Sequence, residues 1–209
     1  MTPALFALIV RKQLSAVVGG PRHGTQYSME KAGPKCGTGA DQVGPLRLRR
    51  FQPPASDIFL TLDSEVLIRP GLGDRLRDAG VTCLGDVLDA ESEASLDVRQ
   101  LRPEATLPPF SPDTRGIVRE RPCPVCGRDG YYGVPNEPYR LCYGPLDESL
   151  ASKDVLATHE RFGSSVLRQP FSESVFAAPV IVVGARVAAV LKGERLRYIE
   201  LQAVEMAGH

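Results

Sequence analysis

Two stretches of the chain share one pattern of hydrophobic and polar positions. Each has a short apolar run, a second β-branched run and a helix-compatible segment. These segments are 57–61, 66–68 and 72–77 in the first stretch, and 154–158, 180–183 and 186–191 in the second. β-Branched runs are typical of buried strands, and apolar residues three or four apart form one face of a helix. Both stretches therefore predict a unit of strands and a helix, whether they reflect a duplication or the frequency of such units in mixed folds.

Three other segments have simpler patterns. Residues 46–50 combine alternating leucines with arginines, which predicts a strand with one solvated face. Residues 198–204 alternate and predict a closing strand. Residues 5–10 are apolar, but the basic residues follow the run instead of preceding it, and the run is too short to span a bilayer. We interpret 5–10 as a short helix or strand, or as extra residues from an upstream start codon.

These patterns predict an α+β fold with mixed sheets, short helices, two strand-helix-strand units and a zinc-knuckle-like turn pair. Glycine and proline clusters mark the joints, but none is long enough to be a flexible interdomain linker. We expect residues 1–20 to be an N-terminal extension and residues 21–209 to form a single domain. Within it, residues 21–128 contain both cysteine turns, and residues 129–209 form the C-terminal strand-helix-strand part.

The composition reduces the range of functions and cellular locations that the chain can be expected to have. The 25 basic and 25 acidic residues balance, so the chain lacks the broad positive field with which nucleic-acid-binding proteins neutralise phosphates. Five cysteines are an odd and unevenly spaced set, which argues against a complete disulfide framework and favours a reducing compartment. The expected location is the cytoplasm, with no membrane partner.

The sharpest local signal is the turn Cys123-Pro124-Val125-Cys126-Gly127. Two residues between the cysteines let both sulfurs face one tetrahedral ion. A second turn, Gly33-Pro34-Lys35-Cys36-Gly37, matches it except that glycine replaces the first cysteine. The predicted metal ligands are therefore Cys36, Cys123 and Cys126, with zinc as the expected ion.

Three interpretations of these cysteines stay open. The first is a zinc ion with a fourth ligand that the spacing does not select: Cys142, His23, Cys83 or a water molecule. The second is a turn pair that has lost its metal, and the third is a redox dithiol. A redox dithiol usually lies at the start of a helix, whose dipole lowers the thiol pKa, and the glycine-rich residues after Cys126 predict no helix.

The sequence favours a protein that is not an enzyme. Only His23, His159 and His209 could act as histidine bases, and His159 lies in a polar segment typical of a surface. The chain has no Walker-type glycine loop, no GxSxG elbow and no HExxH helix.

The cysteine turns and the end of the chain resemble the double-CXXCG paralogous family of myxobacteria, which is described as immunity proteins paired with contact-delivered toxins. The resemblance rests on Gly33–Gly37, on Arg121–Arg128, and on the segment from Pro179 to Leu201. The chain departs from the family pattern at Gly33 and in having no tryptophan, and metal binding is the property that these departures affect.

The resemblance implies an immunity protein that binds and neutralises a cognate protein toxin without catalysis. If that toxin has a basic groove, the densest acidic stretch would complement it: Asp86, Asp89, Glu91 and Glu93. A solvated surface is the alternative interpretation of that stretch. The alternative function is a zinc-ribbon-like interaction module that binds nucleic acid or a protein partner.

Overall fold

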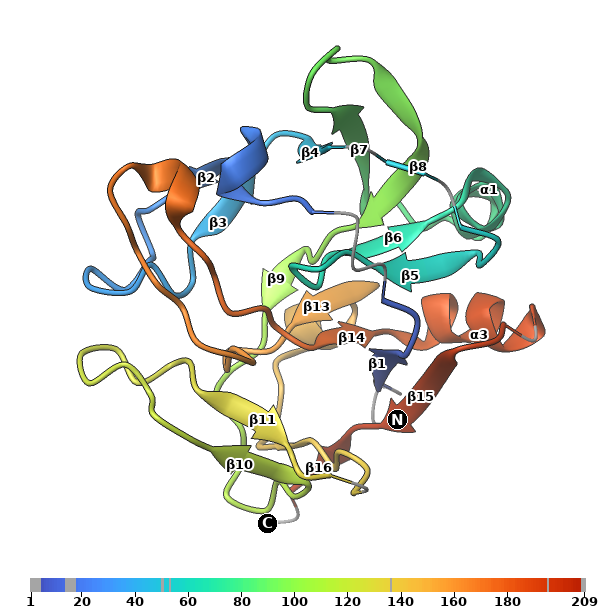
Figure 1. The fold of residues 1–209 in the computed structure, drawn as a ribbon. Coiled ribbons are helices and arrows are strands. Elements are labelled where there is room, and N and C mark those ends of the chain that lie inside the picture. The colour runs from blue at the N-terminus through green and yellow to red at the C-terminus, as the bar shows by residue number, and fades with distance from the viewer. Residues whose placement is uncertain are drawn as a thin grey trace.

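Two five-stranded sheets organise the α+β fold, and each contains one of the two similar stretches (Figure 1). The structure is a computed structural model that describes residues 5–13, 18–49, 51–52, 54–135, 137–194 and 196–207. Residues 1–4 and 14–17 of the expected N-terminal extension, position 50 of the predicted strand and His209 lie outside the described residues. In the described part of the chain, no helix is long and apolar enough to cross a membrane.

The first sheet has the strand order β4-β7-β8-β6-β5. Its strands are β4 (Leu46–Leu48), β5 (Ile58–Leu60), β6 (Val66–Ile68), β7 (Leu84–Asp89) and β8 (Ser95–Leu101). Helix α1 (Pro70–Asp78) follows β6, begins with a proline at a position that needs no N–H donor, and buries Leu72 and Leu76 one turn apart. Both leucines of β4 are buried on one face, which confirms the alternation predicted for residues 46–48.

The second sheet has the order β15-β1-β14-β13-β9. Its strands are β1 (Phe6–Val10), β9 (Ala105–Thr106), β13 (Val155–Ala157), β14 (Ile181–Val183) and β15 (Ile199–Ala203). Helix α3 (Ala185–Gly193) connects β14 to β15. Strand β1 pairs with β14 on one side and β15 on the other, so residues 6–10 belong to the sheet rather than to the N-terminal extension expected over residues 1–20.

The two units have the same topology. In the first, α1 joins β6 to β7, and both strands pair antiparallel with β8, which lies between them. In the second, α3 joins β14 to β15, and both strands pair antiparallel with β1. Each unit is therefore a split β-α-β arrangement, in which a third strand separates two parallel ones. The separating strand follows directly along the chain in the first unit and comes from the N-terminal segment in the second.

The two units also match in individual hydrogen bonds. Thr61 and Thr158 follow β5 and β13, and both side chains are fully buried. The hydroxyl of Thr61 accepts the N–H of Glu65 at 3.1 Å, and that of Thr158 accepts the N–H of Val180 at 3.1 Å. In both units the threonine N–H also donates to the carbonyl of the same partner residue, at 3.0 Å. The repeated sequence pattern therefore corresponds to a repeated local structure.

The two units share one hydrophobic core. Helices α1 and α3 lie next to each other, at the right of Figure 1. Leu72 and Leu76 of α1 belong to the same buried cluster as Val187 and Leu191 of α3. The cluster also takes in residues of both sheets, so the units are stabilised by the same burial of apolar surface.

The remaining elements are short. Three two-stranded pairs are β2 (Gln26–Ser28) with β3 (Asp41–Val43), β10 (Ile117–Arg119) with β11 (Tyr131–Gly133), and β12 (Cys142–Tyr143) with β16 (Glu205–Met206). Short helices are η1 (Pro21–His23), α2 (Glu148–Ala151) and η2 (Phe171–Glu173). The long connection between β13 and β14, residues 159–179, passes beside β2 and β3, where the ring of Phe176 contacts that of Tyr27 with centroids 5.2 Å apart (Figure 1).

Candidate metal centre and the adjoining cavity

The two cysteine turns have the same backbone geometry. In the first, the N–H of Gly37 donates to the carbonyl of Gly33 at 2.7 Å. In the second, the N–H of Gly127 donates to the carbonyl of Cys123 at 2.9 Å. Both closing glycines have positive φ, 76° and 63°, a conformation that side chains with a Cβ rarely adopt. The motif glycines are therefore explained by the turn itself.

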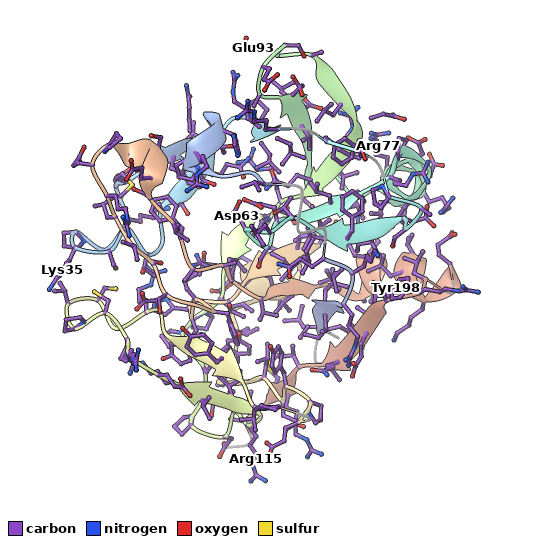
Figure 2. The ribbon with its side chains drawn as sticks, in the orientation of Figure 1. Lys35, Asp63, Arg77, Glu93, Arg115 and Tyr198 are labelled. Carbon is purple, nitrogen blue, oxygen red and sulfur yellow. The ribbon has the colours of Figure 1, made fainter. Side chains whose placement is uncertain are left out.

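The turns bring their cysteines together although they are far apart in the sequence. The sulfurs of Cys36, Cys123 and Cys126 all lie within 4.8 Å of one another. The sulfurs of Cys36 and Cys126 are 3.4 Å apart. Cys36 and Cys123 are buried, and Cys126 is half-buried. The three residues predicted as ligands thus form one cluster that could hold a metal ion. In Figure 2 the first turn reaches the edge of the molecule at Lys35.

Gly33 occupies the place from which a fourth cysteine would reach this cluster. A Cβ atom built on Gly33 would lie 3.0 Å from the sulfur of Cys36 and 3.1 Å from that of Cys126. The other protein ligands considered from the sequence are not part of the cluster: His23, Cys83 and Cys142 do not bring a ligand atom within 4.8 Å of all three sulfurs. Since no histidine, cysteine or acidic residue in the described part of the chain completes the cluster, a water molecule or another exogenous group is the fourth ligand that these residues leave open.

The cluster fits a thiolate-binding metal after a small expansion. Sulfurs around tetrahedral zinc lie about 3.8 Å apart, because each Zn–S bond is about 2.3 Å. Backbone N–H groups of Cys126 and Val125 point at the sulfur of Cys123 and lower its thiol pKa. Burial raises the pKa of Cys36 to about 11, while the Thr38 N–H, 3.4 Å from the Cys36 sulfur, favours its thiolate. A cation at the centre would offset the cost of bringing three thiolates together.

A buried carboxylate that sequence patterning did not identify positions the second turn. Asp129 is 2 % exposed, and one of its oxygens accepts the N–H of Cys123 at 2.7 Å. The other oxygen accepts the N–H of Ser165 at 3.0 Å. Asp129 therefore connects the second turn to the 159–179 connection. On the first turn, Phe176 of the same connection lies so close to Gly37 that a Cβ there would be 2.4 Å from its ring.

The acidic stretch is largely neutralised by arginines. Asp86 pairs with Arg99 at 2.6 Å. Glu91 pairs with Arg49 at 2.6 Å, and Glu93 pairs with Arg47 at 2.8 Å. The remaining member, Asp89, accepts hydrogen bonds from the backbone of Glu91 and Ser92 and closes a turn. The stretch is thus a solvated ion-paired surface, as the alternative interpretation of its sequence held.

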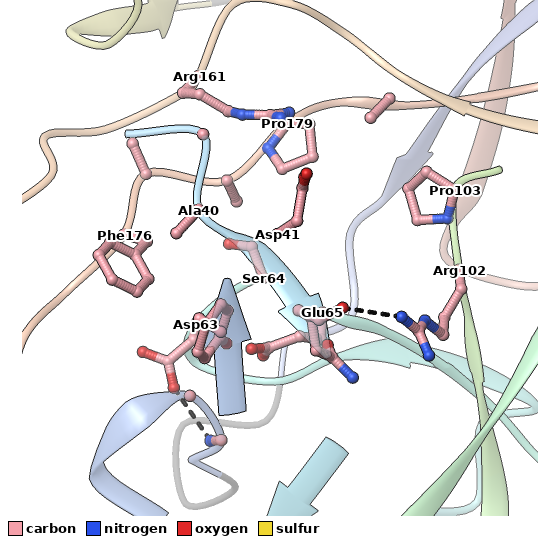
Figure 3. A pocket seen from close by; sticks show the side chains of 18 of the residues that line it. Ala40, Asp41, Asp63, Ser64, Glu65, Arg102, Pro103, Arg161, Phe176 and Pro179 are labelled. Atoms are coloured by element: carbon pink, nitrogen blue, oxygen red, sulfur yellow. Dashed lines mark hydrogen bonds between the residues drawn. The ribbon is translucent and has the colours of Figure 1, made fainter. Parts of the chain in front are cut away.

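A cavity of about 1110 Å³ lies between the two sheets, beside the cysteine turns. Its walls have opposite charges: Asp63 and Glu65 follow β5 on one side, whereas Arg128 and Arg161 lie on the other. Figure 3 shows Arg161 across the cavity from Asp63 and Glu65, with Asp41 between them. Burial raises the pKa of Glu65 to about 7 and also raises that of Asp63.

Two of the histidines considered as bases are described by the structure. His159 lines the cavity, and burial together with the charges of Arg128 and Arg161 lowers its pKa. His23 lies in η1, where burial and Arg49 lower its pKa.

No protein-family model and no curated protein sequence matches this chain. The three-cysteine cluster, the adjoining cavity and the resemblance of the cysteine turns to double-CXXCG proteins are therefore the basis for a functional proposal.

Proposed function

We propose that this chain is an immunity protein that binds a cognate protein toxin and neutralises it without catalysis. The observation that supports this proposal is the convergence of the two cysteine turns, residues 33–37 and 123–127, at one point. The resemblance to double-CXXCG proteins depends on both turns, and it would lose its physical basis if they were far apart. Both turns also share one backbone geometry, which is expected if they form a pair.

The turn pair suits a binding protein because it makes part of the surface rigid. Preorganised surfaces lose less conformational entropy on association and so bind more tightly. We propose zinc as the ion that Cys36, Cys123 and Cys126 hold, since three thiolates favour a thiophilic metal of tetrahedral preference. Asp129 and Phe176 hold the turns by protein contacts as well, so the ion would add rigidity to a preformed arrangement.

The neutralising surface that we propose includes the outer side of the second turn and the connection next to it. Val125, at the tip of that turn, is 58 % exposed. Val166 and Val175 pair across the 159–179 connection, and both are exposed. Exposed aliphatic side chains on a braced backbone can become the buried centre of an interface. The carboxylates of the acidic stretch are less suited, because a toxin would first have to displace their arginines.

Co-expression tests this proposal. Cells that carry the protein encoded immediately upstream of this gene would be grown with and without the chain, and complex formation would be measured with the purified pair. We expect protection and a stable complex. Val166→Glu should abolish both, whereas Glu91→Gln should leave them nearly unchanged. Failure of the wild-type chain to bind or protect would refute the pairing, and loss with Glu91→Gln alone would move the interface to the acidic stretch.

The zinc-ribbon-like module is the competing function, and the turn pair is the observation that favours it. It predicts that the chain binds single- or double-stranded nucleic acid with an affinity that falls steeply as salt rises. An electrophoretic mobility assay at two salt concentrations separates the two functions. Salt-sensitive binding in the absence of toxin protection would favour the module over immunity.

A further inference from the structure

The arginine wall of the cavity contains a buried cation without an ion pair. Arg161 is 6 % exposed, and its Nη1 donates to the carbonyl of Thr158 at 2.8 Å. Among the described residues, no carboxylate oxygen lies within 4.0 Å of its guanidinium. A buried guanidinium is unfavourable unless negative charge and further acceptors compensate it. Its remaining N–H donors are available to a molecule that enters the cavity.

Arg128 adds a second cation with unused donors. Its Nε is buried and has no hydrogen-bond partner in the described part of the chain. Its Nη1 lies 3.4 Å from the carbonyl of Lys31, and a Cβ at Gly39 would be only 2.6 Å from that nitrogen. Gly39 has no Cβ, so the guanidinium can lie against the backbone two residues beyond the first cysteine turn. The charge of Arg128 is close enough to lower the pKa of Arg161.

Two carboxylates lie near this pair without forming an ion pair with it. Asp41 lies beside Arg161 in Figure 3, but its carboxylate is half-exposed and pairs with Lys31 at 3.7 Å. Glu160 is buried, and one of its oxygens accepts the N–H of Phe110 at 2.9 Å, whereas the other has no hydrogen-bond partner in the described part of the chain. The charges of Asp41 and Glu160 act on Arg161, but neither carboxylate lies within 4.0 Å of it. Two neighbouring cations with unused donors and no carboxylate within ion-pair distance can bind phosphate or carboxylate groups.

We propose that this end of the cavity binds the oxyanion group, phosphate or carboxylate, of a small organic molecule between Arg161 and Arg128. His159 lies on the same wall and supplies a further donor. The aromatic pair of Tyr27 and Phe176 also lines the cavity and can contact an apolar or ring-shaped body. The volume of about 1110 Å³ suits a metabolite-sized ligand. The ligand class is therefore an anionic small molecule with an apolar body.

This inference is independent of toxin neutralisation. It concerns the cavity between the two sheets, whereas the proposed neutralising surface lies on the outer side of the second turn and on the adjoining connection, of which Val175 also lines the cavity. The full chain can be tested for oxyanion binding in the absence of any toxin, so failure of one proposal leaves the other standing.

Calorimetric titration of the full chain with sodium phosphate and with sodium acetate, each at constant ionic strength, tests the site. We expect at least one of the two anions to bind with a dissociation constant on the order of 1 mM or lower. Binding of phosphate alone would assign a phosphorylated ligand, and binding of acetate alone a carboxylate. Arg161→Gln should weaken binding at least tenfold. The control variant Arg115→Gln, at the lower edge of Figure 2, should bind as the wild type does.

A second measurement separates a binding role of Arg161 from a structural one. Without added anion, Arg161→Gln should unfold at a urea concentration close to that of the wild type, because the buried charge that it removes costs desolvation but also offsets the charge of nearby Glu160. Saturating anion should then stabilise the wild type but not the variant. Phosphate should also raise the pKa of His159, measured by NMR, since the bound anion offsets the two arginine charges. The proposal is overturned if neither anion binds, or if Arg161→Gln binds as tightly as the wild type.

Discussion

The two split β-α-β units differ mainly at one connection, and the longer connection of the second unit contacts the candidate metal centre and lines the cavity. In the first unit, Thr61 and Glu65 close a short turn between β5 and β6. In the second, Thr158 and Val180 make the same backbone and side-chain hydrogen bonds, but residues 159–179 are inserted between them. The strands and helix of the second unit are preserved around the insertion. The comparison shows that the same arrangement of strands and helix accommodates connections of very different length.

The inserted connection serves the site in two ways. It contributes Arg161 to the cavity, and it contacts both cysteine turns through Ser165 and Phe176. Because protein contacts already hold the turns, their convergence does not depend on four metal ligands. The absence of a cysteine at position 33 is physically tolerable for this reason.

The largest expected effect comes from detaching the insertion from the second turn. Asp129→Ala removes the acceptor of two backbone N–H groups, those of Cys123 and Ser165. Hydrogen bonds to a charged group contribute about 1.5–3 kcal/mol each, so the free energy of unfolding should fall by about 4 kcal/mol. Urea denaturation measures it. Asp97→Ala, at an exposed strand position, is the matched control and should change stability by less than about 0.5 kcal/mol. A loss below about 1 kcal/mol for Asp129→Ala would show that the insertion is held in another way.

Restoring the fourth cysteine is the next largest change. A complete structural zinc site contributes on the order of 12 kcal/mol, so one ligand of four corresponds to about 3 kcal/mol, or about a hundredfold in zinc affinity. Gly33→Cys should show this gain in a competition titration with a zinc chelator. The new side chain needs the sulfurs of Cys36 and Cys126 to move apart, and a bound ion requires the same movement.

The matched control for that variant is Gly144→Cys, which adds a cysteine where no atom lies within 4 Å of the new Cβ. It should leave zinc affinity unchanged. If the insertion holds the turns as described, Gly33→Cys should also change the stability of the metal-free protein by less than about 1 kcal/mol. An equal rise in affinity for both variants would mean that zinc binds to free thiols in general rather than to the cluster.

The sequence was informative wherever local patterning decides structure. It identified both units, because buried β-branched runs and helical spacing survive in residues 57–77 and 154–191. It also paired Cys36 with Cys123 and Cys126, because the two turns carry the same motif. It did not identify β1 as a central strand, since pairing of residues 6–10 with residues 181–183 and 199–203 is set by tertiary packing. Asp129 and Arg161 were missed for a similar reason: only the path of the insertion buries them.

The equivalence of the two threonines can be tested directly. Thr158→Val removes a hydroxyl that accepts the N–H of Val180 and donates to the carbonyl of Glu160 at 2.7 Å. Thr61→Val removes the matching acceptor for Glu65. Each buried hydroxyl makes two hydrogen bonds, so each substitution should lower the free energy of unfolding by about 2 kcal/mol in urea denaturation. The exposed Thr82→Val is the control. If only one of the two substitutions lowers the free energy of unfolding, the units resemble each other in topology but not in the stability that the threonine contributes.

The smallest expected effect concerns the short turn of the first unit and depends on pH. Burial raises the pKa of Glu65 to about 7, from about 4.5 for an ordinary glutamate, so the folded chain holds this proton after the unfolded chain has lost it. The resulting stabilisation is fully present below about pH 4.5 and is lost as pH rises through about 7. Glu65→Gln has no such dependence.

Between pH 5 and pH 8 the wild type should therefore lose about 1.5 kcal/mol of unfolding free energy relative to the variant, a value reduced for partial exposure. Asp63, whose pKa burial also raises, titrates in both proteins and largely cancels in the difference. Burial raises the pKa of Tyr27, so this group does not titrate in the range. Urea denaturation of both proteins at four pH values measures it. A constant difference would show that Glu65 is ionised in the folded turn, and the acidic wall of the cavity would then carry its full charge.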